Sequence, residues 1–347
     1  MGSPQESRRQ FLRRAGLTVA ASGAVSHLGV SVASARTPAP APPDPQRIAR
    51  AYAAGNFLLT LDGVKCGFVR SVEGGGVQAE VINETTGASY FVKKHIGQPK
   101  YEDVTFDLDF RLGKNIYDWI SASWMADYSR KNGSIVAADY QMNATSEREF
   151  KNALVTETTI PAMDATSKEP AYMTIKIAPE YTRLGKSSGK LSMAMSKGDQ
   201  KLWLPTNFKL DIDGLDCSRV TKVDAFTIKQ KTVGNQVGEA RDYLKEPGKL
   251  EFPNLRISIS EISAPSWIDW HEDFVIKGNN GEPQEKNGSL IFYTPNLKQE
   301  LGRIKFYHLG IFRLGGPSSE SAAQVQQLTA ELYCERMEFQ YNPQVVS

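Results

Sequence analysis

Asp107 and Asp109 are the two side chains whose spacing best suits acid–base chemistry. Both carboxylates fall on the polar face of a strand-like run over 106–110, and a carboxylate pair on one face can act as general acid and base. A second, similar segment of the chain has Ser258 and Ser260 at the equivalent places. A carboxylate pair shared by both segments is therefore excluded, and we interpret the two aspartates as the solvated face of a strand.

Histidine and cysteine, the residues that most often bind transition metals, are few and widely spaced. Beyond the N-terminal segment the histidines are His95, His271 and His308, and none has a partner at a metal-ligand spacing such as H-x-x-x-H. His95 and His308 also stand at unrelated places in the two similar segments, so they do not mark a duplicated site. These observations predict no metal site, no cofactor and no enzymatic centre.

Two glycine-rich stretches superficially suggest phosphate binding. Residues 185–190 read GKSSGK, but the glycines are too close and Leu191 follows the lysine, which departs from the G-x-x-x-x-G-K-[ST] pattern. The three glycines at 74–76 precede a strand-like run and not a helix, so they lack the setting of a dinucleotide-binding turn. We expect a flexible linker at the first stretch and a hairpin tip at the second.

The chain has three cysteines, and an odd number argues against a disulfide framework. Cys66 and Cys217 occupy equivalent places in the two similar segments, so Cys334 can pair with only one of them. We interpret all three as small buried residues. A disulfide between Cys217 and Cys334 in an oxidising compartment is the alternative hypothesis.

The N-terminal segment 1–35 resembles a twin-arginine (Tat) export signal. An S-R-R-x-F-L motif precedes a mildly apolar run over 15–32, and the segment ends in a small-x-small cleavage pattern. The positions that carry this resemblance are Arg8, Arg9, Phe11, Leu12, Ala33 and Ala35. A Tat signal implies export of an already folded protein to the periplasm or the outside of the cell; the alternative is a basic tail before a short helix.

The overall charge gives no sign of nucleic-acid binding. Removal of the export signal takes away four basic residues and one acidic residue, leaving 41 − 4 = 37 basic and 39 − 1 = 38 acidic groups. A chain so close to neutral lacks the excess of Lys and Arg that neutralises phosphates.

The rest of the chain divides into two domains on length and composition. A total of 347 residues suggests about two domains, and 40% hydrophobic residues suffice for packed cores. A Pro-rich linker over 36–55 precedes a first domain over 56–183. A Gly-, Ser- and Lys-rich linker over 184–201 then leads to a second domain over 202–342.

The two domains repeat one another in sequence. NFLLTLDGVKC at 56–66 returns as NFKLDIDGLDC at 207–217, an offset of 207 − 56 = 151 residues. Farther along, KNGSI at 131–135 returns as KNGSL at 286–290, an offset of 286 − 131 = 155 residues. Matches that keep the same order along the chain indicate a tandem duplication.

Each copy predicts the same mainly β fold with one helix. Alternating apolar residues predict strands before each Asp-Gly turn, and an apolar stripe predicts one helix that packs on the sheet. The Asn-Gly pairs at 132–133 and 287–288 are expected to adopt positive φ at the end of the helix or the start of a hairpin. The residues that define the repeated framework are Phe57, Asp62, Gly63, Trp119, Phe208, Asp213, Gly214 and Trp270. We therefore predict two tandem antiparallel β-sandwich or barrel domains, each with one packed helix.

The first copy resembles the tail-tube proteins of contractile phages and the inner-tube proteins of extracellular contractile injection systems. The shared pattern is an F-x-[VL]-x-[IL]-D-G strand and turn, a V-x-G bend, a G-x-x-K-Y strand, and a helix that contains a tryptophan. Its residues here are Phe57, Leu59, Leu61, Asp62, Gly63, Val72, Gly74, Gly97, Lys100, Tyr101, Val104, Phe106, Tyr117 and Trp119. The second copy keeps the framework but lacks the Gly-Lys-Tyr signature.

The resemblance implies a structural protein that self-associates into a ring or tube. Because family subunits usually carry one such domain and form hexamers, a two-domain chain implies a pseudo-hexameric trimer, like a hub, tube initiator or terminator. It also implies tail, baseplate or sheath partners, nucleic acid only by passage through a lumen, and a phage virion or injection-system particle as an alternative location. A secreted monomeric β-rich binding module is the competing hypothesis.

Overall fold

The elements that carry the fold lie in two halves of the chain, which we call the first half (55–192) and the second half (203–342). The computed structural model describes residues 55–84, 91–110, 112–192, 203–235, 244–316 and 327–342. The expected export signal (1–35) lies outside the described residues, as does nearly all of the 36–55 linker.

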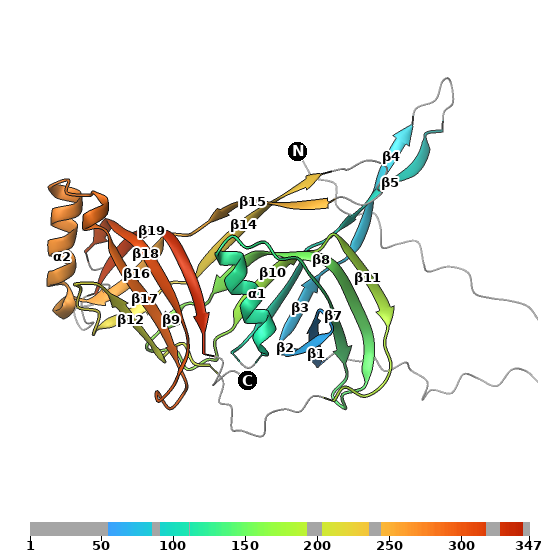
Figure 1. Ribbon diagram of the computed structural model, residues 1–347, viewed down its shortest axis with the longest axis horizontal. Helices are drawn as coiled ribbons and strands as arrows, with labels where there is room; N and C mark the ends of the chain where they lie inside the picture. Colours follow the sequence, from blue (N-terminus) through green and yellow to red (C-terminus); the bar gives the residue numbers. More distant parts are fainter. Residues whose placement is uncertain are drawn as a thin grey trace, which may run out of the picture. The chain divides into compact units, whose positions relative to one another are not determined.

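The first half consists of antiparallel strands and one helix (Figure 1). Its elements are β1 (Asn56–Leu61), β2 (Val64–Val69), β3 (Ser71–Gly74), β4 (Val77–Glu84), β5 (Lys93–Tyr101), β6 (Val104–Leu108), α1 (Lys114–Trp124), β7 (Lys131–Ala138), β8 (Ala144–Ile160), β9 (Met163–Asp164), β10 (Met173–Ala178) and β11 (Tyr181–Lys186). Strand β11 pairs with β8, so the first residues of the expected 184–201 linker belong to the sheet.

The second half has a similar series of elements. They are β12 (Phe208–Ile212), β13 (Val220–Val223), β14 (Phe226–Asn235), β15 (Leu244–Glu251), β16 (Leu255–Ser260), α2 (Pro265–His271), β17 (Lys286–Tyr293), β18 (Glu300–Gly315) and β19 (Gln327–Tyr341). Helix α2 begins at the proline of its first turn, where no backbone N–H is needed, and continues into a π-helical turn over Glu272–Ile276.

The strand order is the same in both halves. In the first half the order β1-β7-β8-β10-β6-β3 runs across the sheet, and in the second half β12-β17-β18-β19-β16-β13 runs in the same way. All of these pairs are antiparallel. The predicted mainly antiparallel β fold with a helix in each half is confirmed.

The helices bury the faces that the sequence indicated. Ile116, Trp119 and Ile120 of α1 are buried, as are Trp267 and Trp270 of α2. The indole N–H of Trp119 donates to the carbonyl of Ser129 at 2.8 Å, which satisfies its one polar atom.

One aromatic core continues from the first half into the second. The ring of Phe110 lies 4.8 Å from Trp203 and 5.6 Å from Phe292, and Trp124 lies 5.7 Å from Phe339 (centroid distances). Because these rings come from both halves, separating the halves would expose a large apolar area to water.

The expectation of positive φ at the two Asn-Gly pairs is wrong. Gly133 and Gly288 lie inside β7 and β17 and keep extended backbone. A Cβ on Gly133 would lie 2.2 Å from the carbonyl oxygen of Thr60 on the neighbouring strand, and a Cβ on Gly288 would lie 2.7 Å from that of Asp211. Glycine is needed here for the close approach of two strands.

The first hairpin of the second half also differs from expectation. After Asp62-Gly63 the chain forms β2, which pairs with β1. After Asp213-Gly214 it forms no strand before β13, because a local hydrogen bond from the backbone N–H of Ser218 to the Asp216 carboxylate (2.9 Å) makes a turn there.

Substitution of Gly133 by alanine is expected to destabilise the protein by roughly 1–3 kcal/mol, because the new methyl group would overlap backbone that cannot move cheaply. The free energy of unfolding from denaturant titration measures the effect. Gly185→Ala is the control, since its new Cβ would meet nothing nearer than 3.9 Å. Equal stability of the two variants would contradict the close-approach explanation.

Candidate functional site: the junction of the two halves

A continuous antiparallel ladder joins the two halves. Residues 157–160 of β8 pair with 226–229 of β14, and β9 then pairs with β13 in the same register. Glu157 faces Lys229 across this ladder, and the hydroxyls of Thr159 and Thr227 are hydrogen-bonded at 2.9 Å. Opposite charges and paired hydroxyls directly across a ladder stabilise strand pairing.

A buried carboxylate anchors the second half's hairpin β14–β15 to the first half. Glu180 is 5% exposed and accepts hydrogen bonds from the backbone N–H of Lys245 (2.9 Å) and from the side-chain amide of Asn152 (2.8 Å). Arg130 lies 3.6 Å from the same carboxylate and donates to the carbonyl of Lys245 at 2.7 Å. The buried charge is therefore both paired and hydrogen-bonded, as such a charge must be.

Two further ion pairs cross the junction at the same hairpin. The ammonium of Lys245 lies 3.1 Å from Asp103, and Arg130 lies 3.5 Å from Glu246. The first half therefore binds the hairpin through hydrogen bonds to its backbone and through ion pairs with its charged side chains. This site is a contact between two parts of one chain.

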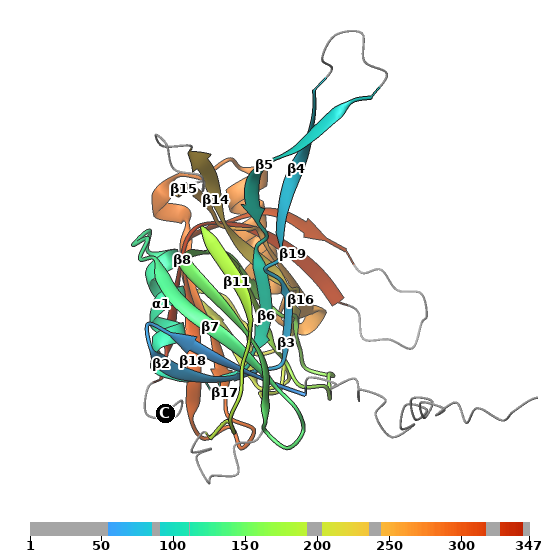
Figure 2. The same ribbon diagram turned by 90° about the vertical axis from the view of Figure 1, so that its right-hand side faces the viewer.

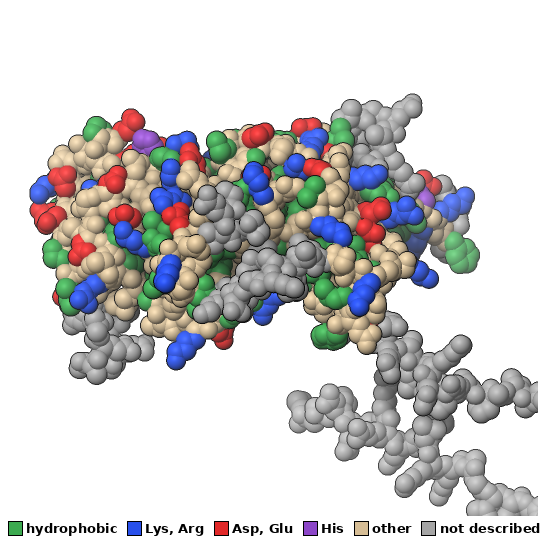
Figure 3. Space-filling view, turned by 60° about the horizontal axis from the view of Figure 1, so that its bottom comes forward, with side chains coloured by type: hydrophobic (Ala, Val, Ile, Leu, Met, Phe, Trp, Pro, Cys, Tyr) green, Lys and Arg blue, Asp and Glu red, His purple; other side chains and the backbone are tan. Residues whose placement is uncertain are grey.

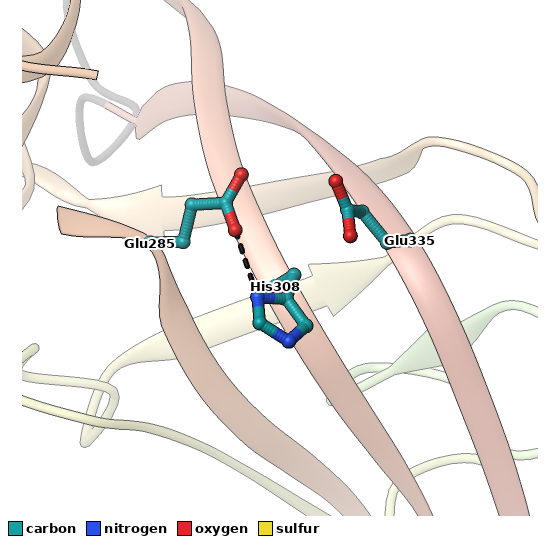
Figure 4. A group of neighbouring side chains, drawn as sticks. All are labelled: Glu285, His308 and Glu335. Atoms are coloured by element: carbon teal, nitrogen blue, oxygen red, sulfur yellow. Dashed lines mark hydrogen bonds and ion pairs between the residues drawn. The ribbon is translucent and has the colours of Figure 1, made fainter. Parts of the chain in front are cut away.

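The equivalent place in the second half holds a different set of side chains (Figure 4). Glu285, His308 and Glu335 bring their ligand atoms within 4.8 Å of one another, and His308 Nδ1 lies 2.9 Å from Glu285 Oε2. The hydroxyl of Tyr333 donates to the other Glu285 oxygen at 2.6 Å. Burial and this hydrogen bond raise the pKa of Tyr333 above its ordinary value.

The strand register identifies these residues as counterparts. Asn152 and His308 both have positive φ (50° and 55°), and each backbone N–H donates to the side chain of the Asn in the preceding KNG motif. The offset along β8 and β18 is thus 308 − 152 = 156 residues.

Sequence reasoning missed the Glu285–His308–Glu335 group because its members come from three separate places in the chain. Only the sheet register brings them together, and the offset of 156 differs from the one visible in the sequence. A carboxylate, an imidazole and a second carboxylate have the donor atoms that bind divalent cations such as Zn²⁺. The expected absence of a metal and a cofactor stays a prediction.

The framework residues predicted from the sequence do not form a common site. Phe57 and Phe208 are half-buried at the starts of β1 and β12, and Trp119 and Trp270 are buried in the helices. Gly63 and Gly214 have positive φ (81° and 72°) in the turns after β1 and β12, and Asp62 and Asp213 precede them. The carboxylate of Asp62 accepts a hydrogen bond at 2.8 Å from the Nζ of Lys131, the first residue of the neighbouring strand β7.

The aspartate pair considered for acid–base chemistry is split by its surroundings. Asp107 accepts hydrogen bonds from Ser71 (2.7 Å) and Thr174 (2.6 Å) on the adjacent strands. Asp109 lies beyond the end of β6 and is buried, so its interpretation as part of a solvated face is wrong: the alternation of faces ends with the strand.

The three cysteines are free thiols in the structure. Cys66 and Cys334 are buried and Cys217 is half-buried, and burial raises the pKa of each thiol to about 11. The Cys217–Cys334 disulfide stays a prediction that counting free thiols in the unfolded protein would decide.

The hairpin β4–β5 is the counterpart of β14–β15 but pairs with no other strand among the described residues. It extends away from the sheets in Figure 2, and every residue of β4 is exposed. Val77, Val81 and Ile96 are 54%, 58% and 68% exposed. Exposed apolar side chains on an unpaired hairpin are typical of a surface that binds another protein.

The charged surface shows no single-sign face in the view of Figure 3, where basic and acidic side chains are interspersed. Within the described part of the chain, no helix has the length and apolar character needed to cross a bilayer.

Comparison with known proteins relates the first half to viral tails. Residues 53–183 match the sequence model of the family described as T4-like virus tail tube protein gp19. The resemblance seen in the sequence is thereby confirmed for this part of the chain, and the matched family is structural and not enzymatic. A search of curated proteins found no match.

Solved structures with similarity to part of this chain include a chain from an extracellular contractile injection system. A chain of the PVC sheath–tube complex in the extended state is 20% identical, with 40% of this chain and 95% of that chain covered and a TM-score of 0.36. A chain of the anti-feeding prophage tube-terminating cap is 20% identical, with 39% and 91% covered and a TM-score of 0.34. Hcp1 from Flavobacterium johnsoniae is 12% identical, with 38% and 93% covered and a TM-score of 0.24.

Removal of the junction carboxylate is expected to destabilise the protein. Glu180→Ala leaves the Lys245 N–H and the Asn152 amide without their acceptor, at a cost of roughly 1–3 kcal/mol in the free energy of unfolding. Glu169→Ala is the control, because that residue is exposed between β9 and β10, and its effect should stay within about 0.5 kcal/mol. Denaturant titration measures the free energy of unfolding of both variants. An equal loss of stability in the two variants would contradict the role of Glu180 as the acceptor that anchors the hairpin.

Proposed function

Since residues 53–183 match the family of T4-like tail tube proteins, we propose that this protein is a structural, non-enzymatic subunit that closes into a ring. The observation that carries the proposal is the ladder between β8–β9 and β13–β14, which joins the halves as neighbouring subunits of a ring would be joined. We further propose that the halves are a tandem duplication, with domains over 56–183 and 202–342. The shared strand order supports this.

The strands that join the two halves are β8 and β14, and their equivalents in the other half are β18 and β4. Among the described residues, β4 and the end of β18 each have one strand edge without a partner. The bulges of the two hairpins fix the offset between β4 and β14 at 230 − 79 = 151, so Val77 and Gln78 are the counterparts of Ile228 and Lys229. At the offset of 156, Arg313 and Leu314 of β18 are the counterparts of Glu157 and Thr158.

Burial differs between the paired and the open edges. Thr156 and Thr158 on the paired edge are buried at 7% and 1% exposure, whereas Phe312, the counterpart of Thr156, is 41% exposed. Among the described residues this end of β18 pairs only with β19, and β4 pairs only with β5. Each chain therefore has two open strand edges. The end of β18 corresponds to the paired end of β8, and β4 corresponds to β14, the partner of β8 in the junction.

Such a chain associates head to tail, with Leu314 of one copy opposite Val77 of the next. Head-to-tail contacts produce a closed ring when the rotation per contact divides a full turn. If the contact between chains repeats the contact within the chain, three copies supply six similar halves, which supports a pseudo-hexameric trimer.

The family match also supports a place in a contractile particle, either a phage virion or an injection system. Tube, sheath and baseplate components are the candidate partners, and nucleic acid would meet the protein only inside the lumen of the ring.

The proposed ring is tested by measuring the mass of residues 36–347 in solution. Mass photometry or light scattering is expected to give three times the mass of one chain, and negative-stain images should show a ring with a pore. Val77→Glu should weaken association by tenfold or more, because it places a charge at the open edge, whereas Val64→Glu, at a similarly exposed valine (53%) outside that edge, should not. A monomer at every concentration would contradict the ring and favour the secreted binding module.

We also propose that residues 1–35 direct export in folded form through the Tat pathway, on the strength of Arg8 and Arg9 in their sequence context. A folded reporter fused to residues 1–40 should leave the cytoplasm, and Arg8→Lys with Arg9→Lys should retain it. A reporter that stays in the cytoplasm with both arginines intact would contradict export.

A further inference from the structure

The two halves carry opposite charges at equivalent positions of the junction. Arg130 of the first half corresponds to Glu285 of the second, at the offset of 155 seen in the KNG motif. The ion pair Lys176–Glu157 (3.3 Å) corresponds to Glu331–Arg313 (3.1 Å), with the signs exchanged between the same two strands.

The hairpins show the same exchange of signs. In β4–β5 the acidic Glu80 lies on the first strand and the basic Lys100 on the second, 3.7 Å apart. In β14–β15 the basic Lys231 lies on the first strand and the acidic Glu251 on the second, 2.7 Å apart. The two hairpins have the same strand pairing, but the acidic and basic residues are exchanged between their strands. The exchange of charges is therefore a property of the contact surfaces and not of the fold.

The residues that dock the inner hairpin have counterparts at the free one. Lys245 and Glu246 of β15 correspond to Lys94 and His95 of β5, at the offset of 151 that the hairpin register fixes. Lys94 and His95 are exposed, and they follow a further basic residue, Lys93. The segment 93–95 of the free hairpin therefore carries basic side chains, with Glu84 of β4 3.8 Å from His95, whereas the docked hairpin has Lys245 and Glu246 at the positions equivalent to Lys94 and His95.

We propose that the Glu285–His308–Glu335 cluster is the docking site for the beginning of β5 (residues 93–95), opposite the end of β4, in a second copy of this chain. The inference rests on the proposed ring and specifies which charged groups join its subunits. The Glu335 carboxylate takes the place of Glu180 and accepts the backbone N–H of Lys94. Glu285 takes the place of Arg130 and faces His95 and the lysines, as Arg130 faces Glu246.

Charge complementarity selects this partner over the other combinations. If the cluster met the β14–β15 hairpin of another copy, Glu285 would face Glu246, and Arg313 would face Lys229 across the ladder. If the Arg130 site met a free β4–β5 hairpin, the guanidinium would face a basic segment. Like charges placed opposite each other exclude wrong partners, so the halves alternate around the ring.

A swap of the two charges tests the proposal in the full mature chain. Glu285→Arg places an arginine beside Glu335, as Arg130 stands beside Glu180. It also places a positive charge opposite the basic residues 93–95 of the other copy. It should raise the dissociation constant of the ring tenfold or more, and His95→Glu, which sets a carboxylate against Glu285, should do the same. The double variant E285R/H95E recreates the Arg130–Glu246 pair and should restore association to within about threefold of the wild type.

Glu272→Arg, at an exposed position beyond helix α2, is the control and should leave the dissociation constant unchanged. Thermal unfolding of each variant at a concentration where the protein is dissociated separates a folding defect from an association defect. A wild-type protein that never associates would contradict the ring itself. Rings that persist unchanged in both single variants would contradict only the docking site.

A bound cation is the other occupant that the cluster's donor atoms could accept. Wild-type rings should withstand a chelator, since the site is filled by the hairpin. Rings that dissociate in the chelator and reassemble with Zn²⁺ would overturn the docking proposal in favour of a metal bridge.

Discussion

The antiparallel ladder between β8 and β14 is the contact on which the rest of the structure depends. It fixes the register between the halves, places the beginning of β15 over Glu180, and closes an aromatic core built from both halves. Backbone hydrogen bonds supply the pairing, while Glu157 opposite Lys229 and the buried Glu180 supply its selectivity. The same chain leaves the counterparts of both edges open, and from this asymmetry we infer an assembly of several copies.

One backbone feature has been adapted in two ways. Each long central strand bulges at a positive-φ residue that is held by the asparagine of a KNG motif. In the first half this bulge presents Asn152 beside Glu180 and Arg130, and the group is satisfied by the docked hairpin. In the second half it presents His308 beside two carboxylates, of which Glu335 is exposed. Since the backbone is the same, the side chains alone determine which hairpin each site accepts.

Much of the fold could be predicted from the sequence, because periodicity and repeated motifs report local structure. The strand before Asp62, the apolar face of α1 and the start of α2 at its proline can each be predicted from the local sequence. The conformation of Gly133 cannot, because its constraint comes from the carbonyl of Thr60 on another strand. The junction and the Glu285–His308–Glu335 cluster cannot be predicted from local sequence either. They depend on which strands pair and on a shift of one residue between β8 and β18, which no single motif reveals. His95 and His308, which looked unrelated in sequence, become neighbours only across the proposed contact between copies.

Hydrogen–deuterium exchange tests the central claim most directly, because it reports strand pairing residue by residue. The amides of 157–160 should be protected at all protein concentrations, since their ladder lies within one chain. Within 312–316 and 76–79, the amides that point away from β19 and β5 should exchange quickly in the dissociated protein and become protected together as the ring forms. Assembly that leaves both open edges unprotected would contradict the account, because the copies would then be joined by some other surface.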